Sequence, residues 1–270
     1  MLGAALRLAG TLAGGALIVL LGLPLLGLLF HVEPAQLVSR LGEPAVLDAL
    51  RLSLVTSTVA AVAVVCLGLP IAYALSRGPF RGRRALETLV DLPMVLPPTV
   101  AGVALLLAFG RMGLAGRVLG FLGISLPFTT LAVIVAQVFM SSPFFVHAAR
   151  AGFASVDRRY REAAATLRAS EPVVFLRVLV PLSLPSLIAG AGMSWARALG
   201  EFGATIVFAG NYPGRTQTMP LGVYIALQQD VELAVTLSLI LVAMSVSLLV
   251  GLRLLPGAGP GVPVAGDSRR

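Results

Sequence analysis

Arg197 and Glu201 carry opposite charges within an otherwise apolar segment. They are four residues apart, so in a helix they share one face and can form an ion pair. Charged side chains inside a membrane rarely face lipid, and they mark either packing contacts or transport paths. Two interpretations follow. The pair is structural and holds a helix bundle together, or the Arg197 guanidinium adds positive potential to a path for anions.

The remaining reactive residues do not form an enzyme site. His31 and His147 lie in different segments, and the sequence has no HExxH pair, G-x-S-x-G serine or paired-carboxylate spacing. Cys66 is the only cysteine, which excludes an internal disulfide and a thiolate metal cluster. All 20 basic residues are arginine, so a Walker A loop, which requires lysine, is excluded. We therefore expect no catalytic residue, metal or cofactor, and any ATP would bind another subunit.

Composition indicates a membrane protein. The chain has 270 residues, of which 57% are hydrophobic and 12% charged, and apolar runs of membrane-spanning length recur along it. We predict an all-α, polytopic protein with about six transmembrane helices. In a soluble protein the net charge of +8 would suggest a nucleic-acid partner, but here the positive-inside rule accounts for the charge. We therefore expect contact with membrane lipid and not with nucleic acid.

The apolar runs predict one transmembrane domain over residues 1–253 and a Gly/Pro-rich, disordered cytoplasmic tail over 254–270. The first run is longer than the apolar region of a signal peptide and lacks an A-x-A site, which favours a retained helix over a cleaved one. With both termini in the cytoplasm, 14 arginines lie inside and five outside. The predicted spans are about 11–30, 52–76, 92–110, 127–146, 179–209 and 231–250.

Proline clusters at the start of the third span. Pro93, Pro97 and Pro98 leave backbone carbonyls without N–H partners, and such carbonyls are tolerated in a membrane only against protein or a water-filled cavity. This start is therefore either part of a pathway wall or hinge, or a kinked packing helix.

A short amphipathic helix is predicted at about 157–171, with Asp157 at its N-terminus. Its arginines and Glu162 surround a small, flat face, which suits a close protein contact. A basic helix lying on lipid headgroups is the simpler alternative. The flat face consists of Tyr160, Ala163, Ala164 and Leu167.

Glu162-Ala163-Ala164, followed by Val178, Val180 and Pro181, resembles the EAA motif of the membrane subunits of bacterial ABC importers. The resemblance implies a type I ABC importer permease fold and makes this segment the coupling helix, which docks on a separate ATPase subunit. Arg168 stands where the motif usually has glycine. Without that glycine the helix is expected to run on.

Three further stretches resemble the molybdate permeases and their tungstate and sulfate/thiosulfate relatives. The resemblance implies a homodimer in a bacterial cell membrane, two ATP-binding subunits and an extracytoplasmic oxyanion-binding protein. A sulfate/thiosulfate permease is one alternative, and an ion-coupled secondary transporter that uses Arg197 and Glu201 is a more distant one. The stretches are 91–102, 195–205 and 211–224.

A tetrahedral dianion needs only a weakly positive, hydrogen-bonding path if a binding protein selects it. The residue types that provide such a path predict four lining residues, Thr99, Arg197, Glu201 and Thr205.

Overall fold

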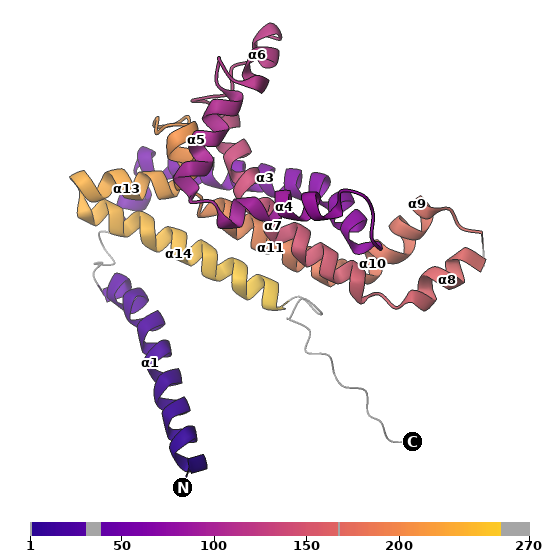
Figure 1. Ribbon diagram of the computed structural model, residues 1–270. Helices are drawn as coiled ribbons and strands as arrows, with labels where there is room; N and C mark the ends of the chain where they lie inside the picture. Colours follow the sequence, from indigo (N-terminus) through magenta and orange to yellow (C-terminus); the bar gives the residue numbers. More distant parts are fainter. Residues whose placement is uncertain (1, 31–38, 167, 255–270) are drawn as a thin grey trace.

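The computed structural model describes residues 2–30, 39–166 and 168–254 (Figure 1). This part of the chain is built from helices and contains no strand. Leu167 and residues 255–270 of the predicted tail lie outside it. The helices are α1 (Leu2–Phe30), α3 (Pro44–Ser76), α4 (Arg83–Val95), α5 (Pro98–Phe109), α6 (Leu114–Phe121), α7 (Thr130–Ser155), α8 (Arg158–Thr166), α9 (Glu171–Val174), α10 (Val180–Leu182), α11 (Leu184–Leu199), α12 (Gly203–Phe208), α13 (Met219–Gln229) and α14 (Val231–Leu254); a π-helical turn, Phe175–Leu179, joins α9 to α10.

Four of these helices are long and apolar enough to cross a membrane: Gly10–Phe30, Pro44–Ser76, Thr130–Ser155 and Val231–Leu252. Two bent helix pairs pass the same test, which gives up to six spans if each pair is one span. The protein is therefore a multi-pass, all-α membrane protein. The long helices correspond to four of the six predicted spans, and the bent pairs to the other two.

The third predicted span, 92–110, is not one straight helix. Its helix begins at Arg83, and the chain turns by 120° between α4 and α5. Pro97 has no N–H to continue the hydrogen-bond ladder, and Pro98 opens α5 at a position where a missing N–H costs nothing. α6 then lies in the predicted loop at 111–126.

The fifth predicted span, 179–209, is also divided. The chain bends by 75° at Ser183, between Glu171–Leu182 and α11. α11 ends at Leu199, and α12 begins only at Gly203. Another difference is α13, which occupies the predicted external loop before the last span.

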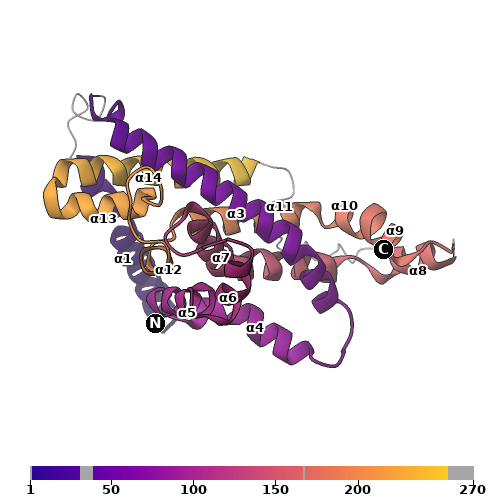
Figure 2. The same cartoon turned by 90° about the horizontal axis from the view of Figure 1, so that it is seen from above.

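The core forms where α3, α7 and α11 pack together along the long axis of the molecule (Figures 1 and 2). Large buried side chains fill it, including Leu75, Phe145 and Phe153. Gly68 allows the close approach of α3 to α7, because a Cβ there would lie 2.8 Å from the Phe145 ring. Gly190 does the same between α11 and α7, where the nearest atom is the Cβ of Ala148.

A second contact region ties α3 to α13 and α14. The Ser53 hydroxyl accepts a hydrogen bond from the Met219 N–H at 2.7 Å, so α3 caps the start of α13. Just before α3, Arg40 Nη1 lies 2.6 Å from Asp230 Oδ2, at the junction of α13 and α14. The pKa of Asp230 is lowered because its carboxylate accepts the Leu233 N–H and then pairs with Arg40. These contacts hold together the end of the bundle that lies opposite α8 (Figure 1).

Candidate functional site

The predicted ion pair is present in the structure. Arg197 Nη2 lies 2.7 Å from Glu201 Oε2, and the Glu201 side chain is 1% exposed while that of Arg197 is 27% exposed. Glu201 Oε1 also accepts the Ala204 N–H at 2.8 Å. Glu201 therefore joins the end of α11 to the first turn of α12 through Oε1, while the buried Oε2 accepts no hydrogen bond and contacts only the Arg197 guanidinium.

A cavity of about 310 Å³ opens beside this pair. Thr99 lines it from the start of α5, Arg197 from the last turn of α11, and Glu201 from the break between α11 and α12. Thr205 is not among the lining residues, and its side chain is fully buried within α12. The structure thus brings three of the four predicted path residues together. Arg197 is the only cation among the lining residues, and Glu201 offsets its charge.

Two glycines that the sequence analysis missed hold α5 against α12. A Cβ on Gly102 would lie 2.8 Å from the Ala204 carbonyl oxygen, and a Cβ on Gly203 would lie 2.6 Å from the Pro98 Cβ. Backbone contact this close leaves no room for any side chain. The glycines therefore set the position of Thr99 relative to the ion pair. No local pattern signals them, because the contact joins segments about 100 residues apart.

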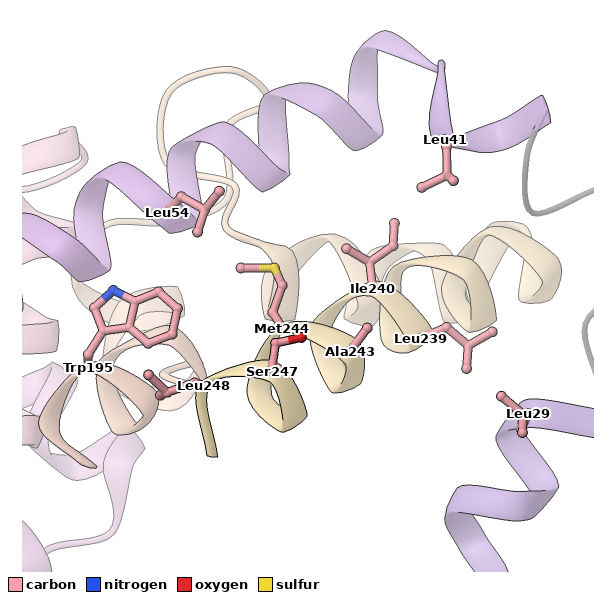
Figure 3. A pocket seen from close by; sticks show the side chains of 10 residues that line it. All are labelled: Leu29, Leu41, Leu54, Trp195, Leu239, Ile240, Ala243, Met244, Ser247 and Leu248. Carbon is pink, nitrogen blue, oxygen red and sulfur yellow. The ribbon is translucent and has the colours of Figure 1, made fainter. Parts of the chain in front are cut away.

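Trp195 lies near this site in sequence but faces elsewhere. Its indole N–H donates to the Thr58 hydroxyl at 3.1 Å, and its ring lines an apolar cavity of about 690 Å³ between α1, α3, α11 and α14 (Figure 3). Leu54, Met244 and Leu248 line the same cavity. Such a lining suits lipid or packing and does not suit an anion. Trp195 therefore anchors α11 to α3.

α8, the predicted coupling helix, lies at the end of the molecule away from α13 (Figures 1 and 2). Asp157 caps it as expected, since Asp157 Oδ1 accepts the Arg159 N–H at 2.9 Å. This hydrogen bond, followed by the nearby Arg159 guanidinium, holds the pKa of Asp157 below its ordinary value. The cap therefore carries a charge that complements the helix dipole.

The predicted contact face of α8 is only partly available. Tyr160 and Ala163 are exposed, whereas Ala164 is 7% exposed and packs inward. Glu162 is exposed, and its Oε1 lies 2.9 Å from Arg158 Nε within the same helix. Leu167 lies outside the described residues. The exposed part that a partner could contact is therefore formed by Tyr160, Glu162 and Ala163.

The expected continuation of this helix through Arg168 is wrong. α8 ends at Thr166, and Arg168 adopts a left-handed backbone with φ of 54°. The Ala169 N–H then donates to the Ala164 carbonyl at 3.1 Å. This is the hydrogen bond of a Schellman motif, whose left-handed position glycine usually occupies. Arg168 thus ends α8 in a conformation that is more usual for glycine.

Arg77 is a residue that sequence reasoning missed. It follows α3, and its guanidinium binds the Glu171 carboxylate at two points, one of them at 2.6 Å. The guanidinium also lies over the Tyr73 ring, 5.3 Å from its centre. Because the partners are 94 residues apart, no local pattern signals the pair. It links the end of α3 to the segment that follows α8.

A family model described as "Binding-protein-dependent transport system inner membrane component" matches residues 52–255. The chain belongs to this family. It therefore contributes a membrane component to a transport system and is not a catalytic enzyme.

Curated members of the family are similar along most of this permease. The "Molybdenum transport system permease protein ModB" of Mycobacterium tuberculosis is 40% identical over 252 residues, which cover 93% of each chain. The protein of the same name from Escherichia coli is 40% identical and covers 67% of this chain and 80% of its own. "Molybdate/tungstate transport system permease protein WtpB" of Thermococcus kodakarensis is 35% identical and covers 82% and 83%.

Solved structures share the fold at low identity. A bacterial alginate ABC transporter, solved with an alginate pentasaccharide-bound periplasmic protein, matches with a TM-score of 0.73 at 14% identity and 93% coverage of both chains. The MetNI methionine ABC transporter matches with a TM-score of 0.63 at 17% identity, covering 77% of this permease and 93% of that chain. The predicted type I ABC importer permease fold is confirmed.

Proposed function

We propose that this permease imports a tetrahedral oxyanion, molybdate or tungstate, as the membrane subunit of an ATP-driven importer. The observation that carries the proposal is the 40% identity over 93% of the chain to a protein named as a molybdenum permease. The further relatives quoted above are also named for molybdenum, molybdate or tungstate, which disfavours the sulfate/thiosulfate alternative.

The working transporter is proposed to be a homodimer of this permease with two ATP-binding subunits below and an extracytoplasmic oxyanion-binding protein above. It lies in a bacterial cell membrane with both termini in the cytoplasm. The absence of lysine supports the separate ATPase, because no Walker A loop can form in this sequence. No cofactor of its own is required, since transport changes only the position of the anion.

Coupling begins at α8. ATP binding draws the ATPase subunits together, and α8, docked through Tyr160, Glu162 and Ala163, moves with them. The Schellman turn at Arg168 and the ion pair between Arg77 and Glu171 connect this motion to α3 and to the chain that leads into α11. The two permease halves then rock between inward-open and outward-open states.

The path is proposed to pass Thr99, Arg197 and Glu201. Glu201 balances the charge of Arg197, so the site attracts a dianion only weakly. Weak attraction favours release, because a tightly held anion would not leave the path. The guanidinium N–H groups and the Thr99 hydroxyl supply hydrogen bonds as the anion passes. Thr205, which is buried, acts through packing of α12.

The test is ATP-dependent molybdate uptake by the complex reconstituted with its ATPase and binding protein. Glu162→Lys should abolish most uptake, while insertion in the membrane is unchanged. Asp48→Lys makes the same charge change at an exposed residue of α3, away from α8, and should leave uptake intact. Normal uptake by Glu162→Lys would refute the docking of α8. Uptake driven by a proton or sodium gradient without ATP would refute the ABC importer assignment in favour of a secondary transporter.

A further inference from the structure

Arg111 and Arg117 lie in a part of the chain that the transport mechanism does not use. They are the only charged residues between 92 and 146, and they flank the first turn of α6. α5 and α6 project from the helical body, far from α8 (Figure 1). Both arginines are exposed, so their guanidinium groups are open to a ligand from outside the protein.

Both arginines line one cavity, of about 550 Å³, between the end of α5, α6 and the turn at 123–125. No acidic residue lines this cavity, while Ser125 contributes a hydroxyl group. Among the described residues, neither guanidinium has an ion-pair partner. The cavity therefore combines positive charge and several N–H donors with no internal counter-charge.

Backbone contacts at α6 fix the shape of this cavity. A Cβ on Gly116 would lie 1.8 Å from the Gly110 carbonyl oxygen, so α6 folds directly back on the end of α5. At the other end of α6, the Ile124 N–H donates to the Leu119 carbonyl at 3.0 Å, with Gly123 at φ of 71°. Both ends of α6 are thus fixed, which holds Arg111 and Arg117 at the same opening.

We propose that Arg111 and Arg117 form a binding site for a tetrahedral oxyanion. Arginine matches such a ligand because its planar fork donates two parallel hydrogen bonds to oxygen atoms. At about 30 Å³ per water molecule, the cavity holds a hydrated anion with room to spare. Two sources share this chemistry: the transported anion as it enters, and the phosphate of an anionic phospholipid. The second is compatible with the apolar side chains of Leu114 and Phe121, which are 92% and 93% exposed beside the cavity.

Two measurements on the full-length permease, purified with its ATPase subunits, test the site and separate the sources. Equilibrium dialysis with radiolabelled molybdate, in phosphatidylcholine nanodiscs, measures binding of the free anion. Native mass spectrometry after purification from a mixture of phosphatidylglycerol and phosphatidylcholine measures retention of the anionic lipid. Neither readout requires transport, so failure of the proposed function would leave both interpretable.

The variants are Arg111→Gln/Arg117→Gln, the charge-conserving Arg111→Lys/Arg117→Lys, and the control Arg215→Gln, which removes one exposed charge from another loop. We expect the double glutamine variant to lose about tenfold in one of the two measurements and the control to match wild type. The lysine variant keeps the charge but not the planar fork, so its binding should fall between these two. A loss in dialysis identifies the free anion, and a loss of lipid identifies the phosphate. Unchanged values in both measurements, or an equal loss in the control, would overturn the proposal.

Discussion

Replacing Arg168 by glycine should stabilise the end of α8. Arg168 occupies the left-handed position of a Schellman motif, where its Cβ crowds the following carbonyl oxygen. The same chain supplies an unstrained reference, because α6 ends in the same motif with Gly123 at that position. The left-handed backbone costs a residue with a Cβ about 1–2 kcal/mol. Glycine avoids this cost, but it loses about 0.5–1 kcal/mol more conformational entropy than other residues when the chain folds.

The net gain from Arg168→Gly is therefore about 0.5–1 kcal/mol, a two- to fivefold slower local opening of the turn. Hydrogen exchange measured by mass spectrometry on peptides that cover 162–169 reports this opening. The Ala169 amide, which donates to Ala164, is the informative probe. Arg168→Ala removes the guanidinium but retains the strained backbone, so it should not slow exchange. Gly123→Ala should speed exchange at Ile124 by a similar factor. Equal exchange in the glycine and alanine variants at 168 would refute the strain argument.

Three further predictions concern charged contacts. Arg197→Gln leaves the buried Glu201 carboxylate without its cation and should lower the free energy of unfolding by about 3 kcal/mol, measured by steric trapping. The double variant Arg197→Gln/Glu201→Gln should recover most of the lost stability. The pKa of Asp157 is lowered from 3.8 in the folded protein, so the charged cap stabilises α8 above about pH 4 and is lost as pH falls through the folded-state pKa. A nitroxide label on α8 should therefore gain mobility at that acidic pH. The Asp157→Asn variant should show no such pH dependence. Arg77→Glu should raise the number of ATP molecules hydrolysed per anion imported, and Arg77→Glu/Glu171→Arg should restore the wild-type ratio. If neither variant changes this ratio, the ion pair has no part in coupling.

Local sequence patterns predicted most of the transmembrane architecture and the ion pair. Hydropathy located the long apolar helices, since a span must be continuous and apolar. The four-residue spacing of Arg197 and Glu201 predicted their contact, because it depends on helical geometry alone. Asp157 was predicted as a cap for the same reason, as capping depends on neighbouring residues.

Features that depend on packing between distant segments were not predicted. The prolines at 97 and 98 indicated a kink, but the 120° turn is set by contact of Gly102 with Ala204 and of Pro98 with Gly203. The helix end at Arg168 was missed because local preference disfavours an arginine with positive φ, and the surrounding structure overrides that preference.

α3 has a mechanical consequence of its own. With 33 residues it is about 50 Å long, well beyond the roughly 30 Å of the hydrocarbon core, so it reaches both membrane surfaces. The chain just before it is tied by Arg40 to Asp230, and the chain just after it is tied by Arg77 to Glu171. A rotation of about 5° around its midpoint moves each end by about 2 Å in opposite directions. Because α3 shares its core with α7 and α11, we expect the three helices to tilt together, so that a displacement at one membrane surface is transmitted to the other.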